Sequence, residues 1–226
     1  MSTRRHPLRT LSAALALSLL GACALPPAAE AAAKLPAPLL DAPRTATHGE
    51  QVAVFAGGCF WGVQDVFEHV RGVRKTWAGY SGGSAATAHY DQVSEGDTGH
   101  AESVKVLFDP AQVSYGQLLQ VFFSVAADPT QFDRQGPDSG TQYRSAIFYA
   151  SPEQQRIAGA YLAQLGKAGI YTAPIVTQLV PLQAFYPAED WHQDYASRHP
   201  GDLYIAINDA PKVTHLRQLF PVLYLP

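Results

Sequence analysis

The chain has 226 residues, a formal net charge of −3, and 47% hydrophobic against 15% charged residues. This composition is typical of a globular protein, and the lack of a basic excess gives no indication of a nucleic-acid partner. Two cysteines, Cys23 and Cys59, are too few for a disulfide framework or a cysteine-rich zinc site, so we expect each thiol to act singly.

The first residues have the layout of an export signal. A basic start precedes a mostly apolar run, Leu11–Ala22, which is too short to be a comfortable membrane anchor. The run ends in Leu20-Gly21-Ala22-Cys23, which resembles the lipobox of bacterial lipoproteins, where cleavage before the cysteine leaves it to carry acyl chains. We predict a lipoprotein-type signal peptide over residues 1–22, lipidation at Cys23, and export to the periplasmic face of a bacterial membrane.

Two features of this leader leave alternatives open. Ala22-Cys23-Ala24 also fits an ordinary signal-peptide cleavage site, which would give a soluble periplasmic protein. Thr3-Arg4-Arg5 looks like the start of a twin-arginine signal, but Pro7 stands where such signals usually carry an apolar aromatic residue. The route of export therefore stays open.

Residues 23–50 are predicted to form an Ala/Pro-rich tether. They contain almost no aromatic or β-branched residues, so they would bury too little surface to repay the entropy of ordering. The remainder, residues 51–226, shows no internal repeat and no second linker, and we interpret it as one domain. This domain contains no methionine, because Met1 is the only methionine of the chain.

Strand and helix patterns interleave through this domain. Short apolar or alternating runs predict strands, and apolar residues at helical spacing or capping signals predict helices. The expected strands are Val52–Ala56, Lys75–Tyr80, Glu102–Phe108, Arg144–Ala150 and Ile175–Val180. The expected helices begin near Cys59, at Ser114 with Gln117 to about Val125, and at Ser151-Pro152 with Gln154 to about Gly166.

Few helices and long loops favour an α/β (α+β) two-layer sandwich. We expect a mixed, ferredoxin-like sheet with an extended C-terminal segment, rather than a doubly wound nucleotide-binding fold. No G-x-G-x-x-G or phosphate-binding loop is present, so nothing in the sequence requires a nucleotide.

Gly57-Gly58-Cys59-Phe60-Trp61-Gly62 is the most informative segment. If a helix begins at Cys59, its free N–H groups and dipole would stabilise a thiolate and lower the thiol pKa below the free value of ~8.5. The two glycines would leave the sulfur uncovered. The alternative is an inert buried cysteine, which is common among free cysteines.

Glu102 begins a strand in which alternation places it on the apolar face with Val104 and Val106. Burial would raise the pKa of its carboxyl and let it give a proton near neutral pH. A register error of one residue would instead send Glu102 to solvent.

Aromatic residues are dense around these two positions. Such a set is more often core than pocket, but Tyr90 and Tyr143 lie in polar, Gly-containing stretches, which favours a site. His192 could be a base, a metal ligand or a structural hydrogen-bonding group. No second His or Cys lies at ligand spacing, so we predict no metal.

Five ordered motifs over about residues 51–200 carry a family resemblance. They are Gly58–Gly62, Gly79–Gly83, Gly96–Glu102, Gly140–Ser145 and Ala188–Gln193. Together they resemble peptide methionine sulfoxide reductase A. The resemblance implies thiol-dependent reduction of methionine-S-sulfoxide, free or in proteins, with no bound cofactor or metal. Residues 51–226 would then be the catalytic domain, and repair of oxidised exported proteins its task.

The resemblance also assigns residue roles by position. Cys59 would attack the sulfoxide sulfur and Glu102 would protonate its oxygen. The remaining residues would orient that oxygen (Tyr90 and Tyr143), form the polar shell behind the site (Asp138), seat the S-methyl group (Phe60 and Trp61) and support substrate binding (His192).

Recycling is where this sequence departs from the family pattern. Many members use further C-terminal cysteines to form a disulfide that thioredoxin reduces, but from residue 60 to Pro226 this chain has none. A Cys59 sulfenic acid would then need an external thiol, either a small thiol or a thioredoxin-like protein. The expected partners are this reductant, oxidised protein or peptide, and a membrane through the lipid anchor, and we expect a monomer.

Two rival functions fit the residues. One is another cysteine enzyme, an acyl transferase or hydrolase with a Cys59–His192 pair and an oxyanion hole. The other is a non-catalytic lipoprotein binding module with an aromatic groove.

Overall fold

The computed structural model describes residues 33–226 together with Met1. The predicted signal peptide, the lipidation site Cys23 and the start of the tether lie outside the described residues. Within the described part, no helix combines the length and apolar character needed to cross a membrane.

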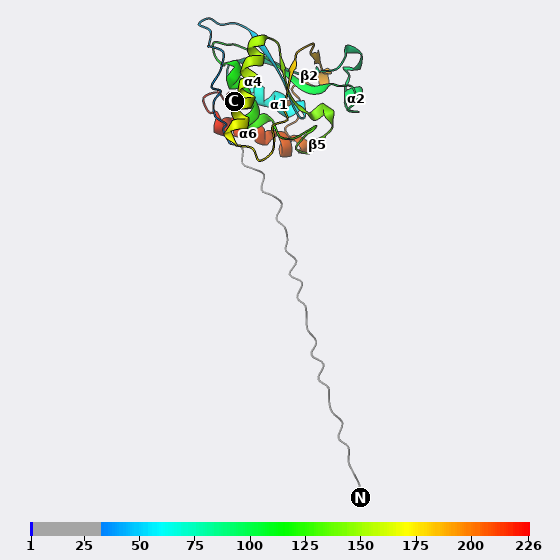
Figure 1. The fold of residues 1–226 in the computed structure, drawn as a ribbon. Coiled ribbons are helices and arrows are strands. Elements are labelled where there is room, and N and C mark those ends of the chain that lie inside the picture. The colour runs from blue at the N-terminus through cyan, green and yellow to red at the C-terminus, as the bar shows by residue number, and fades with distance from the viewer. Residues whose placement is uncertain (2–32) are drawn as a thin grey trace. The chain divides into compact units, whose positions relative to one another are not determined.

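A six-stranded mixed sheet lies at the centre of the fold (Figure 1). Its strand order is β7-β6-β1-β3-β2-β8, and only the β6–β7 pair is parallel. The strands are β1 (Gln51–Gly57), β2 (Val73–Ser81), β3 (Ala101–Phe108), β6 (Ser145–Tyr149), β7 (Gln178–Pro181) and β8 (Tyr186–Pro187), and a separate hairpin pairs β4 (Arg134–Gln135) with β5 (Asp138–Ser139). The predicted α/β class with a mixed sheet is confirmed.

Six α-helices occur in the described residues: α1 (Phe60–Glu68), α2 (Tyr90–Val93), α3 (Tyr115–Val121), α4 (Pro152–Ala168), α5 (Tyr195–Arg198) and α6 (Ala210–Leu219). The capping signals are confirmed. Ser114 forms the complete capping box with Gln117 at the start of α3, and the Ser151 side chain accepts a hydrogen bond from the Gln154 N–H at the start of α4.

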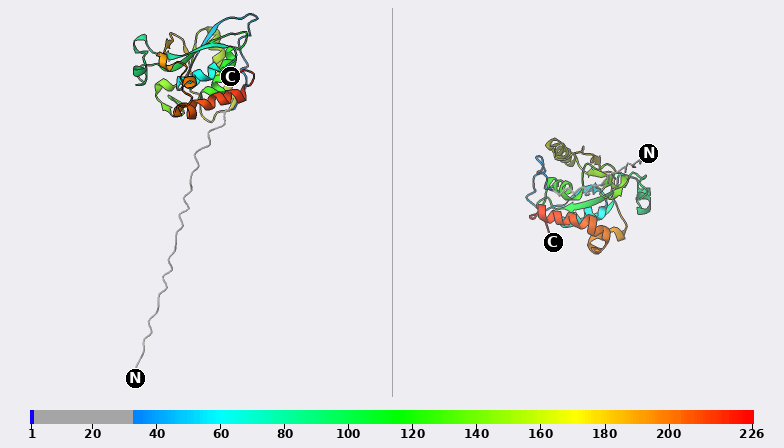
Figure 2. Two further views of the ribbon diagram at one scale, coloured as in Figure 1. Left: turned by 180° about the vertical axis from the view of Figure 1, so that it is seen from behind. Right: turned by 90° about the horizontal axis from the view of Figure 1, so that it is seen from below.

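The C-terminal segment is helical, so the expected extended segment is wrong. A π-helical turn, Ile205–Asp209, leads into α6, which has a proline in its first turn. Ile205, Asp209 and Leu216 recur at helical spacing and are all buried, which gives this segment one face to pack. Figure 2 shows α6, in red, beside α1, in cyan, and the two helices are in contact.

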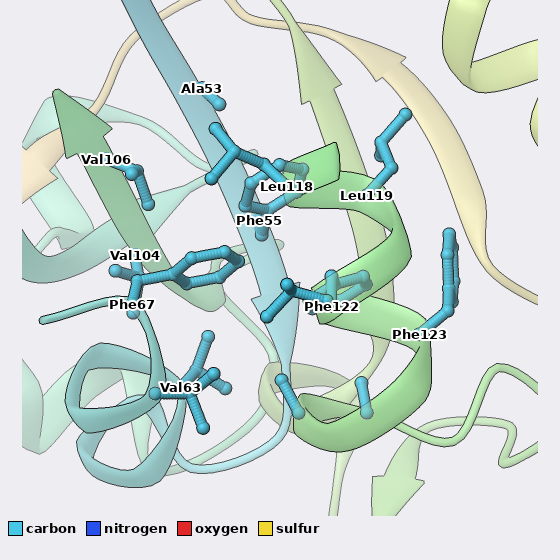
Figure 3. Packing of buried hydrophobic residues seen from close by; sticks show 14 of the residues in the cluster. Ala53, Phe55, Val63, Phe67, Val104, Val106, Leu118, Leu119, Phe122 and Phe123 are labelled. Carbon is cyan, nitrogen blue, oxygen red and sulfur yellow. The ribbon is translucent and has the colours of Figure 1, made fainter. Parts of the chain in front are cut away.

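The main core lies between the sheet and its helices. Phe55 of β1 stacks against Phe67 of α1 and Phe122 after α3, with ring centroids 5.2 Å apart in both pairs (Figure 3). Each such side chain contributes about 1.5–3 kcal/mol when fully buried. The core thus fixes the end of β1 immediately before Cys59.

Part of the predicted tether is packed against the domain, so the tether prediction is wrong for residues 35–41. Leu35 is buried, and its N–H donates to Ser124 Oγ at 3.1 Å. The Asp41 carboxylate accepts the Gly116 N–H at 2.8 Å and so satisfies a free donor at the start of α3. Composition alone could not reveal these two contacts, because their partners lie far along the chain.

Candidate active site

A sharp turn between β1 and α1 presents Cys59. Gly58 has φ +88°, and a Cβ at this position would lie 2.4 Å from the Cβ of Gln135, so the turn requires glycine. Cys59 is the N-cap residue of α1. Its side chain is nearly buried, with 9% of the residue exposed, and it lines a small cavity.

This cavity has a volume of about 80 Å³. Nine residues from seven parts of the chain line it: Cys59, Phe60, Trp61, Tyr90, Glu102, Asp138, Tyr143, His192 and Tyr204. The structure therefore brings together all eight residues that the sequence analysis placed at the site within the described part of the chain. It also adds Tyr204, which the sequence analysis did not place at the site. The only signal in the sequence was the presence of a tyrosine shortly before the C-terminal helical segment.

Glu102 is 4% exposed, and it lies on the face of β3 that carries Val104 and Val106, as the strand alternation predicted. Its Oε2 accepts the Phe60 N–H at 3.0 Å. Burial raises the pKa of this carboxyl to about 8, helped by the negative charges of Asp138 and Asp209. At neutral pH, Glu102 is therefore a carboxylic acid with a proton to give.

The thiol of Cys59 differs from the expectation. Burial raises its pKa well above the ordinary value, and the carboxyl groups of Glu102 and Asp209 raise it further. The backbone N–H of Trp61 and the Lys212 ammonium lower the thiol pKa, but by less. Because burial outweighs the helix N-terminus, the thiol is protonated at neutral pH, and the predicted lowering of its pKa is wrong.

Trp61 forms an ordered aromatic wall. Its ring stacks on Tyr195 with centroids 3.9 Å apart, and Tyr204 approaches it edge-on at 6.1 Å. The Tyr204 hydroxyl donates to Asp138 Oδ2 at 2.5 Å. The tyrosine thus ties the aromatic wall to the hairpin that carries Asp138.

His192 is held as a neutral group. The indole N–H of Trp61 donates to its Nδ1 at 3.0 Å, which places the imidazole proton on Nε2. Burial lowers the His192 pKa to about 4. Nε2 is buried and has no hydrogen-bond partner among the described residues, so His192 makes no hydrogen bond to the Cys59 sulfur. This geometry counts against a Cys59–His192 acyl-transfer pair.

Tyr90 and Tyr143 complete the polar side of the cavity. The Tyr90 N–H donates to Glu189 Oε1 at 3.0 Å, and its ring lies 4.5 Å from that of His192. Tyr143 ends a short 3₁₀ turn, Thr141–Tyr143. Burial raises the pKa of both phenols, so both hydroxyls keep their protons and can donate hydrogen bonds.

In residues 33–226, no three His, Cys, Asp or Glu side chains are grouped so that they could hold a metal ion. The arrangement instead places a cysteine sulfur, a protonated carboxyl and three phenols around one small cavity with aromatic walls. The fold and this site define a cysteine-dependent enzyme that carries its own proton donor.

A family model described as peptide methionine sulfoxide reductase matches residues 51–221. The chain belongs to the peptide methionine sulfoxide reductase A family, and it is a peptide-methionine (S)-S-oxide reductase, an oxidoreductase of protein repair. Members of this family generally take electrons from a thioredoxin-type reductant.

Relatives and solved structures agree with this assignment. The chain is 57% identical over 179 residues to peptide methionine sulfoxide reductase MsrA 2 of Mesorhizobium japonicum, covering 79% of this chain and 92% of the relative. It is 51% identical to the Synechocystis MsrA 2, covering 82% and 88%. Methionine sulfoxide reductase A of Corynebacterium diphtheriae superposes with a TM-score of 0.58 at 38% identity, covering 67% of this chain and 76% of that one.

Proposed function

We propose that Cys59 and Glu102 carry out the reduction. The Cys59 sulfur attacks the sulfoxide sulfur while the Glu102 carboxyl protonates the sulfoxide oxygen, and the proton released from the thiol restores the Glu102 carboxyl. The oxygen passes to Cys59 as a sulfenic acid and methionine leaves, so the substrate gains the two electrons that the cysteine loses. The observation that carries this proposal is a carboxyl with a pKa of about 8 lining the same small cavity as the thiol.

The other cavity residues have supporting roles. Tyr90 and Tyr143 donate hydrogen bonds to the sulfoxide oxygen, and Asp138, fixed by Tyr204, completes the polar shell. Phe60 and Trp61 offer aromatic faces to the S-methyl group, a contact that suits sulfur compounds. His192 supports the wall by accepting the Trp61 indole N–H.

Recycling uses one cysteine and an external thiol. Cys59 is the free cysteine of the described residues, and acylation would remove Cys23 from redox chemistry. A small thiol or a thioredoxin-like protein then attacks the sulfenic acid, releases water and forms a mixed disulfide, which a second thiol resolves.

One equivalent of methionine-S-sulfoxide should therefore leave a sulfenic acid on Cys59. Dimedone should trap it, and mass spectrometry should find the untrapped form heavier than the thiol by one oxygen atom. The chain isolated from membranes is the material to use, because its N-terminus has been processed. A Cys23–Cys59 disulfide in the oxidised protein would overturn the single-cysteine mechanism.

We further propose that the enzyme is an exported lipoprotein that repairs oxidised proteins at the periplasmic face of a membrane. The Leu20-Gly21-Ala22-Cys23 motif supports the anchor. A mature body without methionine suits an oxidising compartment, since it offers the oxidant no thioether of its own.

If the chain is a lipoprotein, the mature protein should begin at Cys23, and this residue should carry lipid. The protein should also sediment with membranes. Intact-mass and peptide mass spectrometry of the natively expressed protein check both points, and Cys23→Ser should release the enzyme from membranes. A free N-terminus at Leu25 would show instead a soluble periplasmic enzyme.

A ferredoxin-like core is our proposal for the sheet. The four strands β6-β1-β3-β2 are mutually antiparallel neighbours. α1 connects β1 to β2, and α3 lies between β3 and β6 in the chain. β7 and β8 then extend this four-stranded core at its two edges.

A further inference from the structure

A carboxylate from the C-terminal segment lies directly behind the nucleophile's helix. Asp209 is fully buried at the junction between the π-helical turn and α6. A Cβ at Gly62 would come within 2.0 Å of Asp209 Oδ1, so the carboxylate packs against the first turn of α1. Glycine at position 62 leaves room for this close approach.

Asp209 is incompletely paired. Its Oδ1 accepts from Lys212 Nζ at 3.0 Å, while its Oδ2 is buried and has no hydrogen-bond partner among the described residues. Burying a carboxylate with an unpaired oxygen costs free energy, and well-packed apolar residues often replace a buried ion pair without loss of stability. Stability therefore does not account for this pair.

The pair acts on both reacting groups. The Asp209 charge raises the pKa of Cys59 and of Glu102, after the larger effect of burial, whereas the Lys212 ammonium lowers the pKa of Cys59. Burial raises the pKa of the Asp209 carboxyl, and the Lys212 ammonium acts in the opposite direction. The other titratable groups around the pair are of two kinds. Asp65 of α1 interacts with the Asp209 charge and pairs with His69. The groups that line the cavity are Tyr90, Asp138, Tyr143, His192 and Tyr204.

We propose that Asp209 and Lys212 are positioning residues that set the electrostatic potential at the Cys59 sulfur and the Glu102 carboxyl, and thereby the pH range of the reaction. The inference rests on the proposed roles of Cys59 and Glu102. Asp209 keeps the proton on Glu102 up to higher pH. Lys212 limits how strongly the same carboxylate opposes ionisation of the thiol. Neither residue lines the cavity, so neither touches the substrate.

The two charges can be removed one at a time. Asp209→Asn leaves the Lys212 ammonium unopposed, so the pKa of Cys59 and that of Glu102 should both fall. Lys212→Gln removes the cation that lowers the pKa of Cys59, so at pH values where the Asp209 carboxyl is ionised the pKa of Cys59 should rise. We expect shifts on the order of one pH unit in opposite directions, as is usual for a nearby charge.

Two readouts on the full-length chain measure these shifts. The first is the iodoacetamide alkylation rate of Cys59 against pH, resolved from Cys23 by peptide mass spectrometry. The second is the single-turnover rate with methionine-S-sulfoxide against pH. Arg217→Gln removes an exposed cation from the same helix, α6, and should leave both profiles in place. Lys212→Arg keeps the positive charge and should give the same two pH profiles as the wild type.

Opposite displacements of the two variants would support the proposal. Equal loss of rate at every pH, with the alkylation midpoint unmoved, would overturn it and leave a purely structural role. Lys212 is partly exposed, so Lys212→Gln keeps the test decisive even where Asp209→Asn does not fold. Because alkylation needs no substrate, it reports on the ion pair even where the proposed roles of Cys59 and Glu102 fail.

Discussion

Cys59→Ser should abolish the reduction of methionine-S-sulfoxide. A serine hydroxyl is a far weaker nucleophile than a thiol and cannot accept the oxygen as a sulfenic acid. Losses of about 10⁴–10⁶-fold are usual when the central group of a catalytic unit is removed. Turnover of dabsyl-methionine sulfoxide with dithiothreitol is the measurement.

Cys23→Ser is the matched control for this substitution. It removes the other thiol of the chain, and it should leave turnover with dithiothreitol intact, because the electrons come from the external thiol. Serine is nearly isosteric with cysteine, so the thermal unfolding of Cys59→Ser should match that of the wild type. Substantial turnover by folded Cys59→Ser would refute the proposed nucleophile.

Local signals in the sequence were sufficient for the longer strands and helices of the sheet layer and for placing Cys59 and Glu102. The Ser114–Gln117 capping box is a contact between residues three apart, so the sequence contains all of it. The period-two alternation of β3 likewise placed Glu102 on the buried face without knowledge of its partners. The family resemblance supplied Tyr90, Tyr143 and Asp138, which the chain's own patterns indicated weakly.

Features that depend on distant contacts could not be predicted in this way. Leu35 is ordered by Ser124, which is 89 residues away, and a count of Ala and Pro cannot show such a contact. Asp209 reaches Gly62 only because α6 packs beside α1. The Cys59 pKa is the clearest case, since the helix N-terminus is a local effect, whereas the burial that outweighs it is a property of the whole fold.

Glu102→Gln should slow the single-turnover reduction by about 10²–10⁴-fold at pH 7, the usual loss for a general acid. The native carboxyl has a pKa of about 8, so it holds a proton at pH 7, and the amide has no such proton to give. The difference between the two enzymes should narrow above pH 8, where the native carboxyl is itself ionised. Rates measured with one equivalent of enzyme from pH 6 to 10 test both the size and the direction of this effect.

A stability measurement separates lost chemistry from a damaged fold. Between the ordinary carboxyl pKa of 4.5 and the folded value of about 8, the native state binds more protons than the unfolded state. The carboxyl therefore lowers the free energy of unfolding as the pH rises through this window. Glu102→Gln removes the titrating carboxyl and with it this loss of stability. An amide oxygen can still accept the Phe60 N–H, so the free energy of unfolding of the variant at pH 8 should be at least that of the wild type.

Glu68→Gln provides the matched carboxyl control. Glu68 is half-buried at the far end of α1, its carboxyl accepts from Thr76 Oγ1 at 2.9 Å, and burial raises its pKa to about 7. It does not line the cavity, so its substitution should leave the single-turnover rate unchanged. Equal rates for Glu102→Gln and the wild type at pH 7 would show that the sulfoxide oxygen takes its proton from another group, and Tyr90→Phe and Tyr143→Phe would then identify the donor.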